Sequence, residues 1–310
     1  MISVRAATAS SLLAATAVGG SIAVTPFIAE FPALAGQAAR YALAAVALVT
    51  VLDRLDPARA GRRPTRRQLV RLTLAAATGS AGFNVLLIAA SRHAEPAAIG
   101  AVVGVSPVVL AVLGAPRAAG RQPRPRPNVL AGAVLATVGV VVLQGGGRSS
   151  AVGLALAVGV LACEVAFTLV AAPLLPELGA ARVSAWSCAL AAGLLATACL
   201  VVGEPLRVPT RLEAGTLLYQ GLVMTAVAFV LWYRGVERLG PDRAGVTMAA
   251  APLAAAGVAA LVGTGSLGMR TVVGAALVAA AVALALRPSS GPPTKDPERD
   301  VSTPFVAHSS

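Results

Sequence analysis

The sequence predicts an all-α membrane protein in which ten transmembrane helices form two five-helix repeats, and three observations support this prediction. First, 57% of the 310 residues are hydrophobic and 12% are charged, about half the charged fraction of an ordinary soluble domain. Second, apolar stretches of about 20 residues follow one another, a length that lets a helix cross a bilayer core. Third, the order of the segments occurs twice.

The repeated order is marked by punctuating residues in one register. The two copies are VLLIAASRHAEPAAIGAVVGVSPVVLA from Val85 and VLWYRGVERLGPDRAGVTMAAAPLAAA from Val230. When they are superposed, two prolines and a glycine coincide: Pro96 with Pro241, Gly100 with Gly245, and Pro107 with Pro252. Three such matches indicate an internal duplication. A duplicated bundle of apolar helices is typical of secondary transporters.

The predicted spans follow the apolar stretches in order. Their ranges are 7–28, 33–52, 70–91, 96–115, 128–145, 151–172, 182–202, 214–235, 244–263 and 269–287. The start resembles a signal peptide, but its apolar run continues to about Ile28, so we expect an uncleaved first helix. The first repeat occupies residues 1–145 and the second 151–287. The Pro- and Ser-rich tail 288–310 is predicted to be disordered.

The positive charge is explained by membrane topology. The net charge is +12, and nearly all the basic residues are arginines. In a soluble chain this charge would favour nucleic-acid binding. Here arginines concentrate in the loops 53–69 and 116–127, as cytoplasmic loops do under the positive-inside rule. We therefore expect both chain ends in the cytoplasm (N-in/C-in), contact with membrane lipid, and no nucleic-acid partner.

The odd number of spans in each repeat has a geometric consequence. The second repeat must insert upside down relative to the first, so that a pseudo-two-fold axis lies in the membrane plane. Inverted repeats of this kind place the substrate site near the midplane, between the halves. Alternating access then requires only that the two halves exchange roles.

Several motifs resemble the EamA-like family of the drug/metabolite transporter (DMT) superfamily over about residues 7–287. The segment PALAGQAAR, from Pro32 to Arg40, is similar to that family's proline-to-arginine pattern at the second span. Alanine-rich turns precede the fourth and ninth spans, which contain Pro107 and Pro252. The fifth and tenth spans carry the glycine-bearing stretches LAGAVLATVGVVVL and VGAALVAAAVALAL.

The resemblance implies an inner-membrane, multi-pass carrier that exports small metabolites, amino-acid-like or drug-like. The chain departs from the family at three places. The family often has tryptophan near the middle of the first and sixth spans, where this chain has Val18 and Glu164. It often has a glutamate after the ninth span, where this chain has Gly265. The resemblance does not identify the substrate.

Two charged residues inside the spans are the first candidates for the site. Arg40 lies roughly 10 Å from the outer end of its span, at 1.5 Å per residue. Its guanidinium either reaches the outer headgroups or anchors an anion in the cavity. Glu164 lies near the centre of its span, and we predict that it carries protons that drive transport. The alternative is a neutral, hydrogen-bonded glutamic acid that stabilises packing. Arg40 has two candidate partners, Glu164 and Glu30.

Polar and amphipathic residues extend the candidate site. Gln37 and Asn84 are candidates for lining the cavity, since lipid offers an amide no partner. Trp232 and Tyr233 belong either to the site or to an interfacial aromatic belt. Pro107 and Pro252 each free a backbone carbonyl, so we expect them to kink their helices and line the cavity.

The function predicted is transport of a small-molecule substrate, and two other classes are the alternatives. A membrane-embedded enzyme would need a nucleophile, a base and oxyanion donors in the spans, and none converge there. A structural membrane subunit would need a large outer domain or binding loop. We expect no cofactor, no metal and no catalytic residue, and a homodimer is left open.

Overall fold

The computed structural model describes residues 4–59, 61–115, 125–145, 147–261, 263 and 268–287, and in these residues the regular elements are helices. The first half contains, in order, α1 (Val4–Val24), η1 (Thr25–Ile28), α2 (Ala33–Leu55), η2 (Pro57–Arg59), α3 (Arg66–Ala75), η3 (Ala76–Gly82), α4 (Phe83–Ala90), α5 (Pro96–Val103), α6 (Ser106–Leu113) and α7 (Pro127–Gln144). The second half contains α8 (Ala151–Ala171), η4 (Ala172–Leu174), α9 (Leu175–Val202), α10 (Arg211–Tyr219), η5 (Gln220–Val227), α11 (Ala228–Leu239), α12 (Pro241–Met248), α13 (Ala251–Leu261) and α14 (Met269–Ala285).

The predicted spans all overlap helical residues, and the all-α membrane class is confirmed. Within the described residues, seven helices are long and apolar enough to cross a membrane by length and composition. One of these, Ala151–Val202, has 52 residues and contains two predicted spans, whereas Met269–Ala285 is a shorter apolar helix. The predicted disordered tail 288–310 lies outside the described residues.

The third segment of each half is built in the same unusual way. Each begins with a capping box, in which a threonine and the residue three positions later satisfy each other's backbone N–H: Thr65 with Gln68 and Thr210 with Glu213. In both halves an α-helix then passes into a π-helix, η3 or η5, and back into an α-helix. π-helices are rare and occur mainly at functional positions. The sequence analysis did not predict them.

The two proline-bearing spans are interrupted by kinks, as predicted, and each remains one span by length and composition. Turns at Gly104–Val105 and Ala249–Ala250 separate α5 from α6 and α12 from α13. Pro107 and Pro252 occupy the first turn of the helices that follow, where a missing N–H costs nothing. The predicted kinks are therefore present, and each lies in the turn just before its proline, where the proline removes a helix hydrogen bond.

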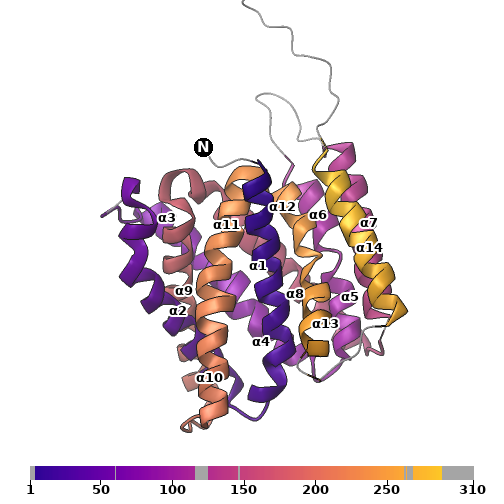
Figure 1. Ribbon diagram of the computed structural model, residues 1–310. Coiled ribbons are helices and arrows are strands. Elements are labelled where there is room, and N and C mark those ends of the chain that lie inside the picture. Colours follow the sequence, from indigo (N-terminus) through magenta and orange to yellow (C-terminus); the bar gives the residue numbers. More distant parts are fainter. Residues whose placement is uncertain are drawn as a thin grey trace, which may run out of the picture.

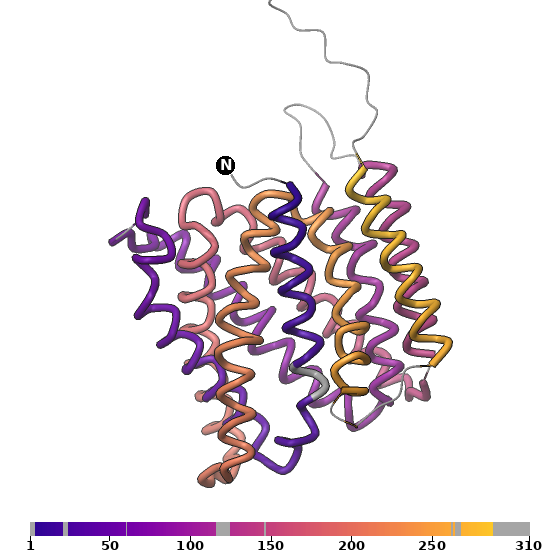
Figure 2. The backbone as a smooth tube through the Cα atoms, in the orientation of Figure 1, coloured from indigo at the N-terminus to yellow at the C-terminus, as the bar shows by residue number. Residues whose placement is uncertain are grey.

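The bundle is organised by contacts between the halves. At one edge α2 packs against α9, and at the other α7 packs against α14 (Figures 1 and 2). Between these edges α1 packs on α11, α12 and α13, whereas α8 packs on α4, α5 and α6. Small residues bring α7 and α14 close, because a Cβ on Gly274 would lie 2.9 Å from the carbonyl oxygen of Gly139.

The bundle has two chemically different ends. We call the end with the loop between α2 and α3 the arginine-rich end, and the other the opposite end. The start of α1 and the end of α14 both lie at the arginine-rich end (Figure 1). A hydrogen bond from Asn128 Nδ2, at the start of α7, to the carbonyl oxygen of Arg287 (2.7 Å) agrees with this placement.

Candidate functional site

Arg40, on α2, is buried without a polar partner. The residue is 5% exposed, and its Nε has no hydrogen-bond acceptor. Its guanidinium carbon lies 4.7 Å from the centroid of the Tyr41 ring. Among the described residues it forms no ion pair, neither with Glu164 nor with Glu30. Its burial contradicts the interpretation in which the guanidinium reaches the headgroups.

Four aromatic rings connect α2 of the first half with α8 and α11 of the second. The Tyr41 and Phe229 centroids are 6.1 Å apart. Phe167 lies 5.2 Å from Phe229 and 5.2 Å from Tyr233. Gly79, in η3, leaves the space that Phe167 occupies, because a Cβ on Gly79 would lie 2.1 Å from the Phe167 Cβ. The rings therefore form a continuous wall across the boundary between the halves.

Polar atoms without partners surround this wall. Asn84 Nδ2 donates to the carbonyl oxygen of Ser80 (2.6 Å) and to Tyr41 Oη (3.4 Å). The buried atoms that lack a hydrogen-bond partner here are Gln37 Oε1, Ser80 Oγ, Ser187 Oγ and Tyr233 Oη. Buried polar side chains are normally paired, so these atoms are candidates for contacting a ligand.

Glu164 lies on α8 and contacts the break in the fourth predicted span. Ser106 Oγ, at the start of α6, donates to Glu164 Oε1 (3.1 Å). The other carboxyl oxygen, Oε2, is buried without a partner. Burial with a single hydrogen bond disfavours the ionised carboxylate. The break before Pro107 therefore places the hydroxyl of Ser106 next to the carboxyl group of Glu164, a contact that the sequence analysis did not predict.

The matching position in the other half has no such acid. There α1 meets the break between α12 and α13 through Gly19. A Cβ on Gly19 would lie 2.2 Å from the carbonyl oxygen of Ala251, the residue before Pro252. The break between α12 and α13 is thus packed closely against the backbone of α1 at Gly19. The break between α5 and α6 instead contacts the carboxyl group of Glu164. The two halves differ most in chemistry at this place.

Trp232 and Tyr233 are buried in the protein core. They are 5% and 0% exposed and lie in a cluster with Ala14, Leu72 and Phe167. An interfacial belt faces lipid headgroups, so that alternative is wrong for both residues. Tyr233 belongs to the aromatic wall, whereas Trp232 packs against apolar neighbours.

Charged residues at the arginine-rich end join the halves, and the sequence analysis missed their pairing. Arg182, on α9, is 1% exposed and donates from Nη2 to Asp53 Oδ1 (2.6 Å), while its Nη1 lies 3.8 Å from Asp56 Oδ2. Arg59 lies 3.1 Å from Asp56 and 3.8 Å from Glu237 on α11. We call Asp53, Asp56, Arg59, Arg182 and Glu237 the charged tie.

A backbone break explains why Arg182 is buried. Gly179 has φ 76° and ψ 158°, a conformation that is essentially restricted to glycine. The break lets the chain approach α2 closely, because a Cβ on Gly179 would lie 2.4 Å from Asp56 Oδ2. The sequence analysis did not single out Arg182, which is the first residue of the predicted span 182–202. A glycine three residues before an arginine at the start of an apolar run was the available signal.

The opposite end joins the halves through a carboxylate and backbone amides. Glu204, after α9, accepts from the backbone N–H groups of Leu34 (3.1 Å) and Ala35 (2.8 Å) at the start of α2. Arg207 Nη2 donates to the carbonyl oxygen of Glu30 (3.1 Å), and hydrogen bonding to Glu213 raises the pKa of Arg207. Glu30 is thus a partner of Arg207 rather than of Arg40.

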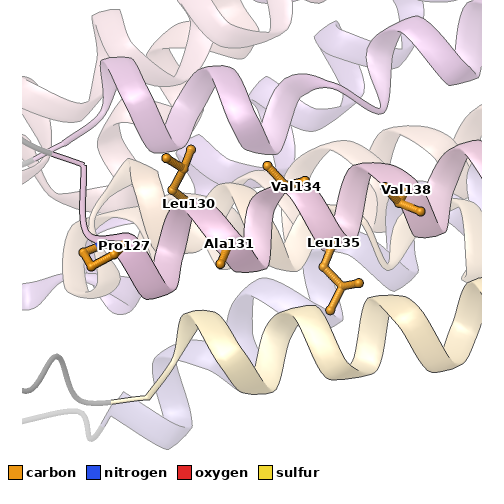
Figure 3. A pocket seen from close by; sticks show the side chains of 6 residues that line it. All are labelled: Pro127, Leu130, Ala131, Val134, Leu135 and Val138. Carbon is orange, nitrogen blue, oxygen red and sulfur yellow. The ribbon is translucent and has the colours of Figure 1, made fainter.

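Two hollows lie away from Arg40, Glu164 and the aromatic wall. A depression of about 570 Å³ runs along α7, and its lining is apolar: Pro127, Leu130, Ala131, Val134, Leu135 and Val138 (Figure 3). A second hollow of about 170 Å³ lies beside the charged tie and is lined by Arg59, Arg234 and Arg238 among others. Neither contains a predicted site residue, so we place the candidate site at the buried polar atoms.

Metal chemistry finds no support in the described residues. No group of three His, Cys, Asp or Glu side chains there could hold a metal ion. Cys163, Cys188 and Cys199 form no disulfide bond. That the protein works without a cofactor remains a prediction.

Comparisons with known proteins agree with this architecture. A solved crystal structure, described only as "Crystal structure of protein", is similar with a TM-score of 0.78 and 21% identity over 92% of this chain and 98% of that one. At this identity the similarity shows the fold alone.

Sequence comparisons point to a family. Residues 151–287 match the model of the EamA-like transporter family. The uncharacterized transporter YdeK of Bacillus subtilis (strain 168) is 28% identical over 184 residues, which are 58% of this chain and 62% of YdeK. The match thus spans less than two thirds of that relative. Together with the apolar helices, these findings indicate a multi-pass membrane protein that is similar to the EamA-like transporter family over residues 151–287.

Proposed function

We propose that the protein is a secondary carrier that exports small metabolites across the inner membrane by alternating access. The observation that carries this proposal is the set of buried polar atoms without partners where the halves meet, including Arg40 Nε, Tyr233 Oη and Glu164 Oε2. Leaving such atoms unpaired is costly, and a bound substrate supplies the missing partners. The YdeK relative bears the name of a transporter, which supports the same function.

Ten crossings in two inverted repeats are supported by how the helix contacts correspond. Exchanging the halves converts α1 packed on α11, α12 and α13 into α8 packed on α4, α5 and α6. It converts the contact of α2 with η5 into that of α9 with η3. The pairs α2–α9 and α7–α14 are each converted into themselves. A pseudo-two-fold axis between the halves accounts for all of these relations.

We assign the arginine-rich end to the cytoplasm. It carries the loop with Arg59, Arg62 and Arg63, and basic loops are retained on the cytoplasmic side. The first helix, α1, begins there and the last helix, α14, ends there (Figure 1), in keeping with an N-in/C-in topology. The turn at Glu95 then faces outwards.

Transport itself is tested in inside-out vesicles. The vesicles contain the protein, and uptake is measured for a panel of labelled amino acids and organic acids with and without an imposed proton gradient. We expect saturable uptake of at least one compound that vesicles lacking the protein do not take up. Uptake of none, together with chemical conversion of one of them, would instead favour a membrane enzyme.

Glu164 is the residue that we propose for proton coupling. Its buried carboxyl group alternates between a protonated state, held by Ser106, and an ionised state when the site opens to water. In proteoliposomes, Glu164→Gln is expected to retain exchange of labelled for unlabelled substrate but to lose acceleration by a pH gradient. Glu95→Gln, at the opposite end, is the matched control. An unchanged gradient dependence in Glu164→Gln would rule out the coupling role.

A further inference from the structure

Two buried arginines in this protein differ in whether acidic side chains lie near them. Arg182 is 1% exposed and has two aspartates within 3.8 Å. Arg40 is 5% exposed, forms no ion pair among the described residues, and has an Nε without a hydrogen-bond acceptor. Burying a cation is unfavourable unless it is paired, so Arg40 lacks an anion that Arg182 already has.

The groups around Arg40 are suited to an organic anion. The guanidinium lies over the face of Tyr41, which stabilises the cation without neutralising it. Tyr233 is linked to Tyr41 through the ring of Phe229. The hydroxyls of Tyr233 and Ser187 lie close enough to each other to interact, and neither has another hydrogen-bond partner among the described residues. Arginine and hydroxyl groups offer donors to an oxyanion, and arginine binds carboxylates in a planar, two-pronged arrangement.

The aromatic wall adds an apolar requirement. Tyr41 lies beside the cation, and Phe229, Phe167 and Tyr233 continue from it ring to ring. A ligand that neutralises Arg40 must therefore also fit against rings. A flat or apolar body next to the acid group satisfies this condition, whereas a small hydrated anion does not.

We propose that Arg40 binds the carboxylate of the transported substrate, with the substrate's apolar body against the wall of Tyr41, Phe167, Phe229 and Tyr233. This inference rests on the proposed carrier function and assigns to it a substrate class: small organic acids with a flat apolar part. Arg40 is then a substrate-binding residue rather than a residue that stabilises the fold.

Binding of benzoate and of its neutral isostere benzamide to the purified, detergent-solubilised protein tests the proposal. We expect saturable heat of binding by isothermal calorimetry for benzoate, and at least tenfold weaker binding for benzamide and for sulfate. Arg40→Gln is expected to weaken benzoate binding at least tenfold, and Arg40→Lys to weaken it less, because charge remains. The exposed Arg211→Gln is the matched control and is expected to bind as the unaltered protein does.

Each other outcome is decisive. Equal binding of benzoate by Arg40→Gln, or equal binding of benzamide by the unaltered protein, would overturn the assignment of a carboxylate to Arg40. Sulfate binding as tight as that of benzoate would overturn the role of the rings. Size-exclusion profiles and thermal midpoints of the variants show whether they are folded, and Arg40→Lys decides the question if Arg40→Gln is not.

The test also separates this inference from the carrier function. Transport of amines alone in vesicles, with no benzoate binding, would leave the carrier and reject the anion site. Benzoate binding through Arg40 without transport of any compound would leave the anion site and reject the carrier.

Discussion

The two ends of the α2–α9 pair are joined by different kinds of polar contact. At each end an acid at or just beyond the C-terminal end of one helix contacts the N-terminal part of the other. At the arginine-rich end Asp53 and Asp56 contact the buried side chain of Arg182. At the opposite end Glu204 contacts only backbone N–H groups of Leu34 and Ala35. Breaking a buried ion pair costs more than losing a helix cap, so the opposite end should open more readily.

The largest effect is expected from removing both acids that face Arg182. Asp53→Asn combined with Asp56→Asn leaves a fully buried cation without a counter-charge, which should destabilise the protein by about 3 kcal/mol. Either substitution alone should cost less, because one acid remains. Denaturant unfolding in detergent measures these values, and Arg148→Gln, which removes the partner of Glu95 at the opposite end, is a control expected to change little. A double variant as stable as the unaltered protein would remove the asymmetry between the ends.

Two glycines with positive φ give a matched test of the same comparison. Gly179→Ala places a methyl group 2.4 Å from Asp56 in a conformation restricted to glycine, and should cost about 1–3 kcal/mol. Gly203→Ala, at the opposite end, meets nothing within 4 Å in a left-handed conformation and should cost about 1 kcal/mol. The ratio of the two effects, read from thermal midpoints, reports how closely packed the arginine-rich end is. Equal effects would mean that the close approach at Gly179 is not maintained.

Glu204→Gln should produce a smaller change. The amide is a weaker acceptor for the N–H groups at the start of α2, and loss of a helix cap costs about 1 kcal/mol. The more informative consequence is kinetic, because labelling of a cysteine introduced at Gln37 should become faster from the outside. Slower outside labelling would show that Glu204 does not hold this end closed.

The smallest effect concerns the surface pair of Glu95 and Arg148. The hydrogen bond from Arg148 holds the pKa of Glu95 below its usual value of 4.5. A depressed folded-state pKa means that the stabilisation is present above that value and is lost as the pH falls through the lowered one. Thermal midpoints of the unaltered protein and of Arg148→Gln should therefore differ slightly at pH 7 and converge near pH 3. A difference that persists at pH 3 would assign the effect to something other than this pair.

The sequence predicted the helices well because an apolar run of about 20 residues has the length of a membrane-spanning helix. The breaks before Pro107 and Pro252 were also accessible, since proline cannot continue a helix. Burial of Glu164 was foreseen from its central position. Its hydrogen bond with Ser106 was not, because it depends on how two distant helices pack.

What escaped prediction is tertiary. Arg182 reads as a charge at the end of a span until the backbone break at Gly179 turns it inwards. Phe167 and Phe229 are ordinary apolar residues in the sequence, and only packing brings them to Tyr41. The π-helices have no recognised sequence signal in this chain, although they occupy equal places in the two halves.

The central claim is that the two halves expose one polar site alternately to the two sides of the membrane. The most direct measurement uses a variant without Cys163, Cys188 and Cys199, in which Gln37 is replaced by cysteine. A membrane-impermeant thiol reagent is added to right-side-out and to inside-out vesicles. The account predicts labelling from both sides, with protection by a bound substrate in each case. Labelling from one side only, whatever substrate is present, would contradict it.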